Sequence, residues 1–272
     1  MPSNEQRRAA AKRKLERQLA NRADRARKRK RLMIAGSALG VVVVAAAAVG
    51  VYFLTKGDGN KPAAISCDYR DSQKPADKQV QKPRTSGIEN TGDNASLSVS
   101  METTQGPIGL TLDNAKAPCT VNSFASLASQ GYFDNTTCHR MTADEGLKVL
   151  QCGDPTGTGT GGPGYQFDNE YPTNRYNPAD PALQQPMDYK RGTLAMANAG
   201  PDPVTGGGTN GSQFFIVYGD SKLPPNYTIF GTVDPDSMGT LDKIAAGGQD
   251  NSNGQGDGKP NLPVTIQSVR LD

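Results

Sequence analysis

Three stretches in the second half of the chain decide its fold: CHRM at 138–141, QCGDPTGTGTGGPGY at 151–165, and GTLAMANAG to GSQFFIVY between 192 and 218. The apolar runs 193–197 and 213–218 of the third stretch are typical of strands, and short strands are also expected around 139–141 and 147–151. The middle stretch continues into a loop rich in glycine and proline. Together they predict short strands that carry an arginine and two glutamines, separated by long loops rich in glycine and proline.

The segments around these stretches also favour a β fold. Residues 97–103 and 108–112 alternate apolar and polar side chains on either side of a Gln105-Gly106-Pro107 turn, as in a β-hairpin. A closing strand is predicted at 264–271.

Two helices are predicted as well. Thr120 is a candidate cap for a helix that stops at Gly131, and a second helix is expected at 237–246. Many short strands with two helices predict a mainly β domain over residues 96–272, a closed antiparallel barrel with helices over its ends.

The N-terminal part has a different composition. The net charge of +3 combines a strongly basic segment, residues 1–31, with a mildly acidic remainder. Residues 32–54 contain no charged side chain and would form a helix of roughly 34 Å, enough to cross a bilayer core of about 30 Å. We therefore expect a single transmembrane helix at 32–54 that binds membrane lipid.

The charges beside this segment predict its orientation. The basic cluster Arg27–Arg31 lies directly before it, so the N-terminus is expected in the cytoplasm and the predicted β domain outside the cell membrane. A cleaved signal peptide is the alternative, but 31 residues before the apolar core are too many. Nucleic-acid binding by the basic cluster is not expected, because lipid contact and orientation explain it more simply.

Residues 55–95 are polar and show little periodicity, which predicts a flexible stalk between membrane and domain. All four cysteines follow residue 54, so disulfides are plausible in an oxidising compartment. Three pairings are possible. Cys138 and Cys152 lie at the two ends of a hairpin predicted from the CHRM and LKVLQ strands, at matching distances from its turn. Residues in such positions can face each other, which favours the pairing Cys138–Cys152 together with Cys67–Cys119.

From residue 96 to residue 272 the order of elements and of the three quoted stretches resembles a cyclophilin-type peptidyl-prolyl cis-trans isomerase. The resemblance implies an eight-stranded barrel, rotation about the peptide bond before proline, and no cofactor or metal. It also implies that the partners are proline-containing segments, which here would belong to unfolded or exported proteins.

The resemblance further implies the roles of individual residues. Arg140, Gln151 and Asn198 are expected to act in catalysis, with the guanidinium of Arg140 favouring the twisted amide. Phe215 is expected to form an apolar slot for the proline ring, whereas its neighbour Phe214 would face the core. The expected substrate-binding residues are His139, Leu147, Val149, Ala197, Ala199, Gln213, Phe215, Leu223 and Tyr227.

Three departures from the family pattern concern the edge of this site. The turn before Gln151 is longer than usual, so that either Leu147 or Lys148 replaces the usual pocket phenylalanine. Lys222 stands where many relatives carry a tryptophan, and the chain has no tryptophan at all. Residues 200–212 are also longer than usual, beside the subsite that precedes proline.

Other functions fit the sequence less well. A hydrolase would need His139, the only histidine, and a nucleophile elbow that is missing. Gly157, Gly159 and Gly162 match a dinucleotide-binding pattern, but no helix follows them. The remaining alternative is a cyclophilin-like module that binds proline-containing peptides, or acts as a holdase, without turnover.

Overall fold

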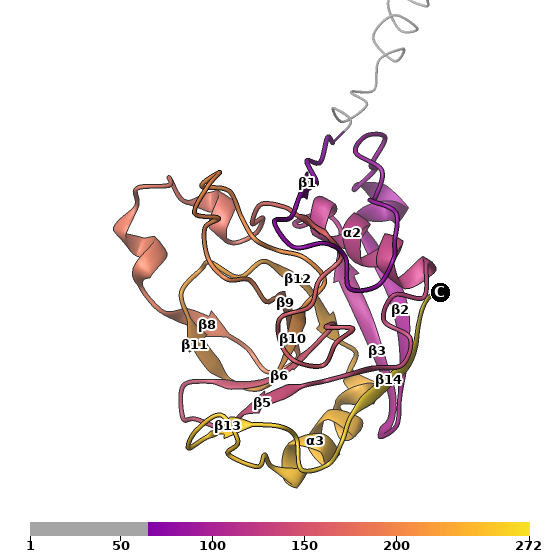
Figure 1. The fold of residues 1–272 in the computed structure, drawn as a ribbon, viewed down its shortest axis with the longest axis vertical. Coiled ribbons are helices and arrows are strands. Elements are labelled where there is room, and N and C mark those ends of the chain that lie inside the picture. The colour runs from indigo at the N-terminus through magenta and orange to yellow at the C-terminus, as the bar shows by residue number, and fades with distance from the viewer. Residues whose placement is uncertain (1–64) are drawn as a thin grey trace, which may run out of the picture. The chain divides into compact units, whose positions relative to one another are not determined.

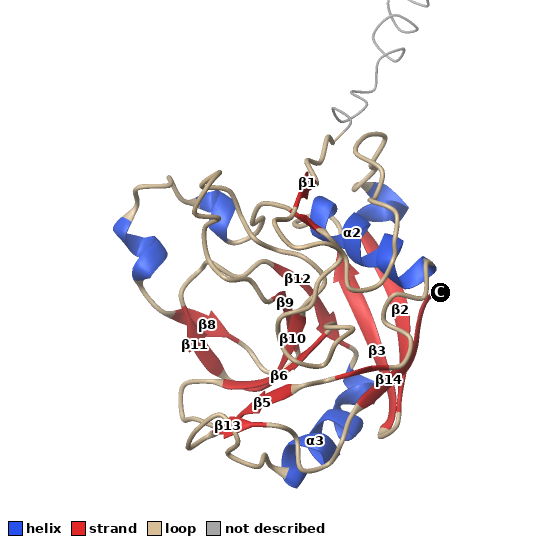
Figure 2. Cartoon of the chain, viewed as in Figure 1, coloured by secondary structure: helices blue, strands red, loops and turns tan. Residues whose placement is uncertain are grey.

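The computed structural model describes residues 65–272, and its main feature is one antiparallel sheet of ten strands in the order β13-β5-β6-β10-β9-β12-β3-β2-β14-β4 (Figure 2). Two small sheets pair β1 with β7 and β8 with β11. The strands are β1 (Arg70–Asp71), β2 (Ser96–Thr103), β3 (Gly106–Asp113), β4 (Thr136–Thr137), β5 (Arg140–Thr142), β6 (Lys148–Cys152), β7 (Tyr165–Gln166), β8 (Met187–Tyr189), β9 (Thr193–Met196), β10 (Phe214–Gly219), β11 (Ser221–Leu223), β12 (Ile229–Val233), β13 (Asp257–Gly258) and β14 (Thr265–Leu271).

The helices are α2 (Pro118–Ser129) and α3 (Met238–Gly247), with single 3₁₀ turns η1 (Gly92–Ala95), η2 (Thr173–Arg175), η3 (Pro181–Gln184) and η4 (Pro235–Ser237). α2 packs against β14 and β3, and α3 packs against β3 and β10. The two α-helices lie at different ends of the curled sheet (Figure 1).

The sheet confirms a mainly antiparallel β fold but not the closed eight-stranded barrel. It has ten strands, and its terminal strands β13 and β4 are not paired with each other in the described part of the chain. The sheet is nevertheless curled, because only Cys138 and His139 separate β4 at one end from β5 near the other. The added strands β4 and β13 have two residues each, too few to show an alternating pattern.

The predicted hairpin is present, with β2 and β3 paired from Ser96↔Asp113 to Thr103↔Gly106. Gly106 has φ +129°, a conformation that residues with a side chain rarely adopt.

The start of α2 differs from the prediction. The helix begins at Pro118, whose fixed φ suits a first helical residue, and Thr120 lies inside it and is buried. The cap comes from a distant residue: the Glu170 carboxylate accepts the backbone N–H groups of Cys119 and Thr120. Sequence alone could not show this, because Glu170 is about fifty residues away.

The interior contains two separate apolar clusters. The larger lies between the sheet and the helices and includes Phe124, Phe133 and Phe214. The smaller lies around Phe215. Neighbouring residues of a strand face opposite sides, so Phe214 and Phe215 belong to different clusters, as the alternation predicts.

Residues 65–95 do not form the flexible stalk that the sequence predicts. Cys67, Tyr69 and Ile88 are buried, and β1 pairs with β7. A disulfide joins Cys67 to Cys119, and a second joins Cys138 to Cys152, which is the pairing favoured from the sequence. The few apolar residues of this segment are too widely spaced for a periodic pattern, so their burial was missed.

The predicted tail, the transmembrane helix at 32–54 and the first part of the stalk lie outside the described residues and stay predictions. Within residues 65–272, neither α-helix has the length and apolar character needed to cross a membrane.

Candidate active site

The site lies on the face of β5, β6, β9 and β10 that points away from the main core. The strand register places Arg140 opposite Gln151, and Gln151 opposite Phe215. Phe215 in turn lies opposite Ala195 of β9. The strand pairing therefore brings an arginine, an amide and an aromatic ring onto one surface.

Arg140 is held in a defined orientation by two partners. Its Nε donates to both carboxylate oxygens of Asp257 at 2.9 and 3.0 Å, and its Nη2 donates to Oδ2 at 2.5 Å. Its Nη1 donates to Oε1 of Gln151 at 3.2 Å. A guanidinium has five N–H groups, so one on Nη1 and one on Nη2 remain for another acceptor.

Asp257 was missed by the sequence analysis. It lies after α3, in a loop whose short strand β13 pairs with β5, and so comes next to Arg140 across 117 positions of sequence. Nothing in the sequence NGQGDG distinguishes this acid from a solvated loop residue. The hydrogen bond with Arg140 lowers the pKa of the Asp257 carboxyl and raises the pKa of the Arg140 guanidinium.

A row of side-chain amides continues from the arginine. Gln151 Nε2 donates to Gln213 Oε1 at 2.9 Å, and Gln213 Nε2 donates to the carbonyls of Gly159 and Gly161 at 3.0 Å each. The row therefore joins Arg140 to the glycine-rich loop, and the orientation of each amide is set by its neighbours.

The glycine-rich loop is organised around one buried carboxylate rather than around a ligand. Asp154 accepts hydrogen bonds from the backbone N–H groups of Thr156, Thr158 and Gly159. Burial opposes its ionisation, but these hydrogen bonds outweigh burial and lower the pKa of Asp154. The loop forms a wall of the site.

An apolar cluster lies beside the arginine. Val149, Tyr189, Ala195, Phe215 and Val217 are buried in it, and Phe215 contacts the ring of Tyr227 edge-on, with the centroids 5.8 Å apart. Leu147, Met187, Ala197, Leu223, Tyr227 and Ile229 are half-buried around them. Tyr189, Met187 and Ile229 were missed, because they come from strands with no recognisable motif.

The cluster resolves the ambiguous turn before Gln151. Leu147 packs against the apolar cluster, whereas Lys148 lies beside Gly219. Leucine therefore occupies the edge of this pocket. Lys222, which is exposed on β11, does not contribute to the cluster.

Comparison with known proteins agrees with this geometry. Residues 98–271 match the family model described as "Cyclophilin type peptidyl-prolyl cis-trans isomerase/CLD". The "Probable peptidyl-prolyl cis-trans isomerase B" of Mycobacterium leprae is 50% identical over 308 aligned positions, covering 100% of both chains. The protein of the same name from Mycobacterium tuberculosis is 58% identical over 215 positions, 78% of this chain and 67% of that one.

The chain belongs to the cyclophilin-type peptidyl-prolyl cis-trans isomerases. It is thus an isomerase of the peptide bond before proline. A solved cyclophilin-type isomerase of Cryptosporidium parvum is 32% identical, with a TM-score of 0.49, and the match covers 65% of this chain and 98% of that one.

In this cyclophilin the side chain of Asn198 is engaged within the protein. Its Nδ2 donates to the Asn226 carbonyl at 2.9 Å, and its Oδ1 accepts the N–H of Gly200 at 3.0 Å. Further contacts reach the side-chain oxygens of Asn169 and Asn210. The backbone N–H and C=O of Asn198 have no partner among residues 65–272, so the backbone is the part that remains for a peptide.

His139 lies under the glycine-rich loop, where a Cβ on Gly159 would be 3.4 Å from the imidazole. Both ring nitrogens are buried without a hydrogen-bond partner in the described part of the chain. Burial lowers the pKa of the imidazole. A neutral ring in this place fills space, and nothing orients it as a base toward a nucleophile.

Proposed function

We propose that this cyclophilin rotates X-Pro bonds without a covalent intermediate, and that Arg140 stabilises the twisted amide. The observation that carries the proposal is the fork of Arg140: three of its N–H groups are bound by Asp257 and Gln151, and the other two have no partner within residues 65–272. Gln151 and Phe215 are opposite each other in the strand register. A proline ring against Phe215 would therefore bring its peptide bond close to the guanidinium.

Catalysis of this rotation requires only a small stabilisation of the transition state. Rotation about an X-Pro bond is slow because the nitrogen lone pair is delocalised into the carbonyl, with a barrier near 20 kcal/mol. A donor directed at the nitrogen favours the rotated state, in which the lone pair is localised. A turnover of about 10 to 10³ per second requires only about 4 to 7 kcal/mol of stabilisation. A few oriented hydrogen bonds can supply this.

The substrate backbone would be bound by groups next to the slot. Gln151 has one Nε2–H left after its bond to Gln213, which holds the Gln151 amide in place, and Asn198 presents its backbone N–H and C=O. Ala197 and Ala199 are small, which leaves room for an extended chain along this edge. The proposed partners are proline-containing segments of unfolded or exported proteins.

The mechanism can be tested with Arg140→Lys, which keeps the charge and loses the fork. Isomerisation of an Ala-Pro peptide by the full-length chain is measured by NMR exchange, and peptide affinity is measured in the same samples. We expect affinity within about threefold of wild type and catalysis reduced by about tenfold or more. Equal loss of both would mean that Arg140 only binds the peptide. A wild-type chain that binds without catalysis would be a holdase.

We further propose that the isomerase domain lies outside the cell membrane, anchored by residues 32–54. The uncharged segment and the basic cluster before it support this orientation, and two disulfides fit an oxidising compartment. In intact cells, external protease should digest the region 65–272 and leave a membrane-bound N-terminal fragment. Complete protection in intact cells, with digestion after lysis, would contradict this location.

A further inference from the structure

A cavity of about 470 Å³ lies next to the proposed catalytic residues and is not explained by the proline slot. It shares Gln151, Gln213 and Ala197 with the site already described. Ala197 also packs on the Phe215 cluster, so the cavity and the proline slot are adjacent. A peptide with its proline in the slot would therefore place a neighbouring side chain at this cavity.

Three segments that are far apart in sequence form the cavity walls. One is the end of the glycine-rich loop, from Gly159 to Gly164, with strand β7 after it, and another carries Asp202, Pro203 and Thr209 in the long insertion. The third is Ser72–Pro75, which comes before the residues matched by the family model. This last wall belongs to the segment that the sequence analysis interpreted as a stalk.

The Ser72–Pro75 wall is bound directly to the glycine-rich loop. Ser72 donates its N–H to the Gly164 carbonyl at 3.0 Å, and Asp77 donates its N–H to the Gly162 carbonyl at 3.1 Å. Gly162 in turn donates to the Asp77 carboxylate at 2.9 Å. A Cβ on Gly164 would lie 2.8 Å from the backbone nitrogen of Ala76, so the two backbones are in close contact.

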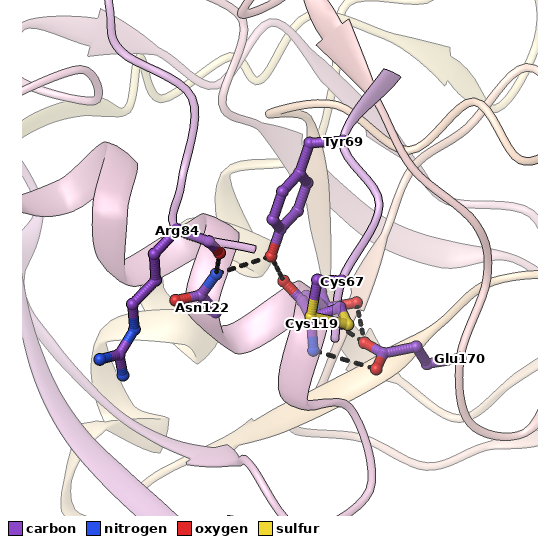
Figure 3. The surroundings of a disulfide bond; sticks show 7 residues. Cys67, Tyr69, Arg84, Cys119, Asn122 and Glu170 are labelled. Carbon is purple, nitrogen blue, oxygen red and sulfur yellow. Dashed lines mark hydrogen bonds between the residues drawn. A yellow bond between two sulfur atoms is a disulfide. The ribbon is translucent and has the colours of Figure 1, made fainter. Parts of the chain in front are cut away.

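The residues before the wall are tied to the domain by a dense set of contacts. Arg70 donates to Asp168 at 2.7 Å and to the Gly208 carbonyl at 3.1 Å, which also fixes the insertion. Cys67 is bonded to Cys119 at the start of α2, beside the Glu170 carboxylate (Figure 3).

Tyr69 completes this attachment. Its hydroxyl donates to the Cys119 carbonyl at 2.7 Å and accepts from Asn122 at 2.8 Å (Figure 3). The ring packs edge-on against Tyr165 and Phe167, the residues that follow the glycine-rich loop. The wall is thus held at both ends and at a fixed distance from the amide row.

Two charged residues of opposite sign, Lys74 and Asp202, line the cavity within the described part of the chain. Lys74 is exposed, and its Nζ has no ion pair or hydrogen bond with residues 65–272. The other charged lining residue, Asp202, is buried and accepts hydrogen bonds from Gln166, Val204 and Thr205. Asp77, near the wall, is engaged by Gly162. The available charge for a side chain entering the cavity is therefore positive.

We propose that the Ser72–Pro75 wall selects the substrate side chain that enters this cavity, and that Lys74 favours an acidic side chain there. The inference rests on the proposed function, because it assumes that the peptide lies along the amide row. It assigns Lys74 to specificity and not to catalysis.

The test compares peptides that differ only at the two residues before proline, each set in turn to glutamate, glutamine or lysine. The ratio of kcat/KM for the glutamate and lysine peptides is measured for the full-length chain. We expect Lys74→Gln to lower this ratio by about two- to fivefold, and Lys74→Glu to lower it further, as for a partly exposed ion pair. The effect should weaken in high salt.

Lys243→Glu is the matched control, since Lys243 is an exposed lysine of α3 outside the cavity lining, and this variant has the same net charge as Lys74→Glu. The ratio for Lys243→Glu should equal that of wild type. Identical ratios for Lys74→Glu and Lys243→Glu would overturn the inference. Failure of the wild-type chain to isomerise the glutamine peptide would instead overturn the proposed function.

A second variant tests the wall itself. The double substitution Cys67→Ser and Cys119→Ser removes the covalent tether and leaves Lys74 in place. We expect faster backbone hydrogen exchange at 70–77 and a glutamate preference reduced by at least about twofold, with the glutamine peptide turned over as in wild type. An unchanged preference in a variant whose exchange at 70–77 has risen would contradict selection by this wall.

Discussion

Asp257 accepts both the Nε–H and an Nη2–H of Arg140, while Gln151 accepts one Nη1–H, so that two N–H groups of the guanidinium have no partner within residues 65–272. Paired hydrogen bonds between a guanidinium and a carboxylate fix geometry as well as charge. Asp257 does not belong to the proline slot or to the cavity lining. It is therefore a positioning residue for Arg140.

Asp257→Asn should reduce kcat by about tenfold, a loss of about 1.4 kcal/mol of transition-state stabilisation, with KM within about threefold of wild type. The amide has one acceptor oxygen instead of two and carries no negative charge, so it holds the guanidinium less firmly. Asp250→Asn in the same loop, where the carboxylate binds the backbone of Ser252 and Lys259, is the control. Equal activity of the two variants would contradict positioning by Asp257.

Leu147 and Lys148 are neighbours with different surroundings, which allows a matched test of the proline slot. Leu147→Ala should lower kcat/KM by about fivefold, because it removes part of the apolar surface beside Val149 and Phe215. Lys148→Ala should change kcat/KM by less than about twofold. Both variants are measured with one Ala-Pro peptide. A larger loss of kcat/KM for Lys148→Ala than for Leu147→Ala would show that the lysine borders the slot.

Activity should be independent of pH between about 6.5 and 9. The Arg140 guanidinium stays charged throughout this range, and its pKa is raised further by Asp257. Burial lowers the pKa of His139, so the imidazole is neutral over the same range. A pH–rate profile with an inflection that disappears in His139→Gln would show that the histidine takes part in proton transfer.

Stability in acid should depend on Asp202. Hydrogen bonds from Gln166 and from the backbone of Thr205 and Val204 lower its pKa to about 2 from 3.8. Because the folded state favours the ionised carboxylate, Asp202 stabilises the folded state fully above about pH 4. This stabilisation is lost as the pH falls toward 2. Urea unfolding at pH 5 and pH 2.5 measures the difference.

Asp202→Asn should therefore lose less stability than wild type between these two pH values. Asp93→Asn, at an exposed site in η1, is the control and should behave as wild type. An equal loss in wild type and Asp202→Asn would mean that the Asp202 carboxyl is not held in its ionised form by folding.

Much of the fold follows from local sequence patterns. The β2–β3 hairpin follows from the alternation of apolar and polar residues in its two strands. Phe214 and Phe215 belong to different clusters because neighbouring residues of a strand face opposite sides. The start of α2 at Pro118, instead of Thr120, depends on the Glu170 carboxylate, which is distant in sequence. Strands of two residues, such as β4 and β13, are too short to show an alternating pattern in the sequence, so they could not be predicted.

The candidate site also combines residues that the sequence identifies with residues that it does not. Arg140, Gln151 and Gln213 were found through their motifs, and the strand register places them in one row. Asp257 and Lys74 were missed because each lies in a polar segment that resembles any other loop. Asn198 is also expected to act in catalysis, but its side chain is bound within the protein, so its backbone is the part that remains for a substrate.

The central claim is that Arg140 stabilises the twisted peptide bond. The most direct test is kcat/KM for an Ala-Pro peptide with Arg140→Ala, compared with wild type and with Arg270→Ala, an exposed arginine paired with Asp134. We expect a loss of about 100-fold, or about 2.7 kcal/mol, for Arg140→Ala and no loss for Arg270→Ala. Arg140→Ala activity within about twofold of wild type would contradict it.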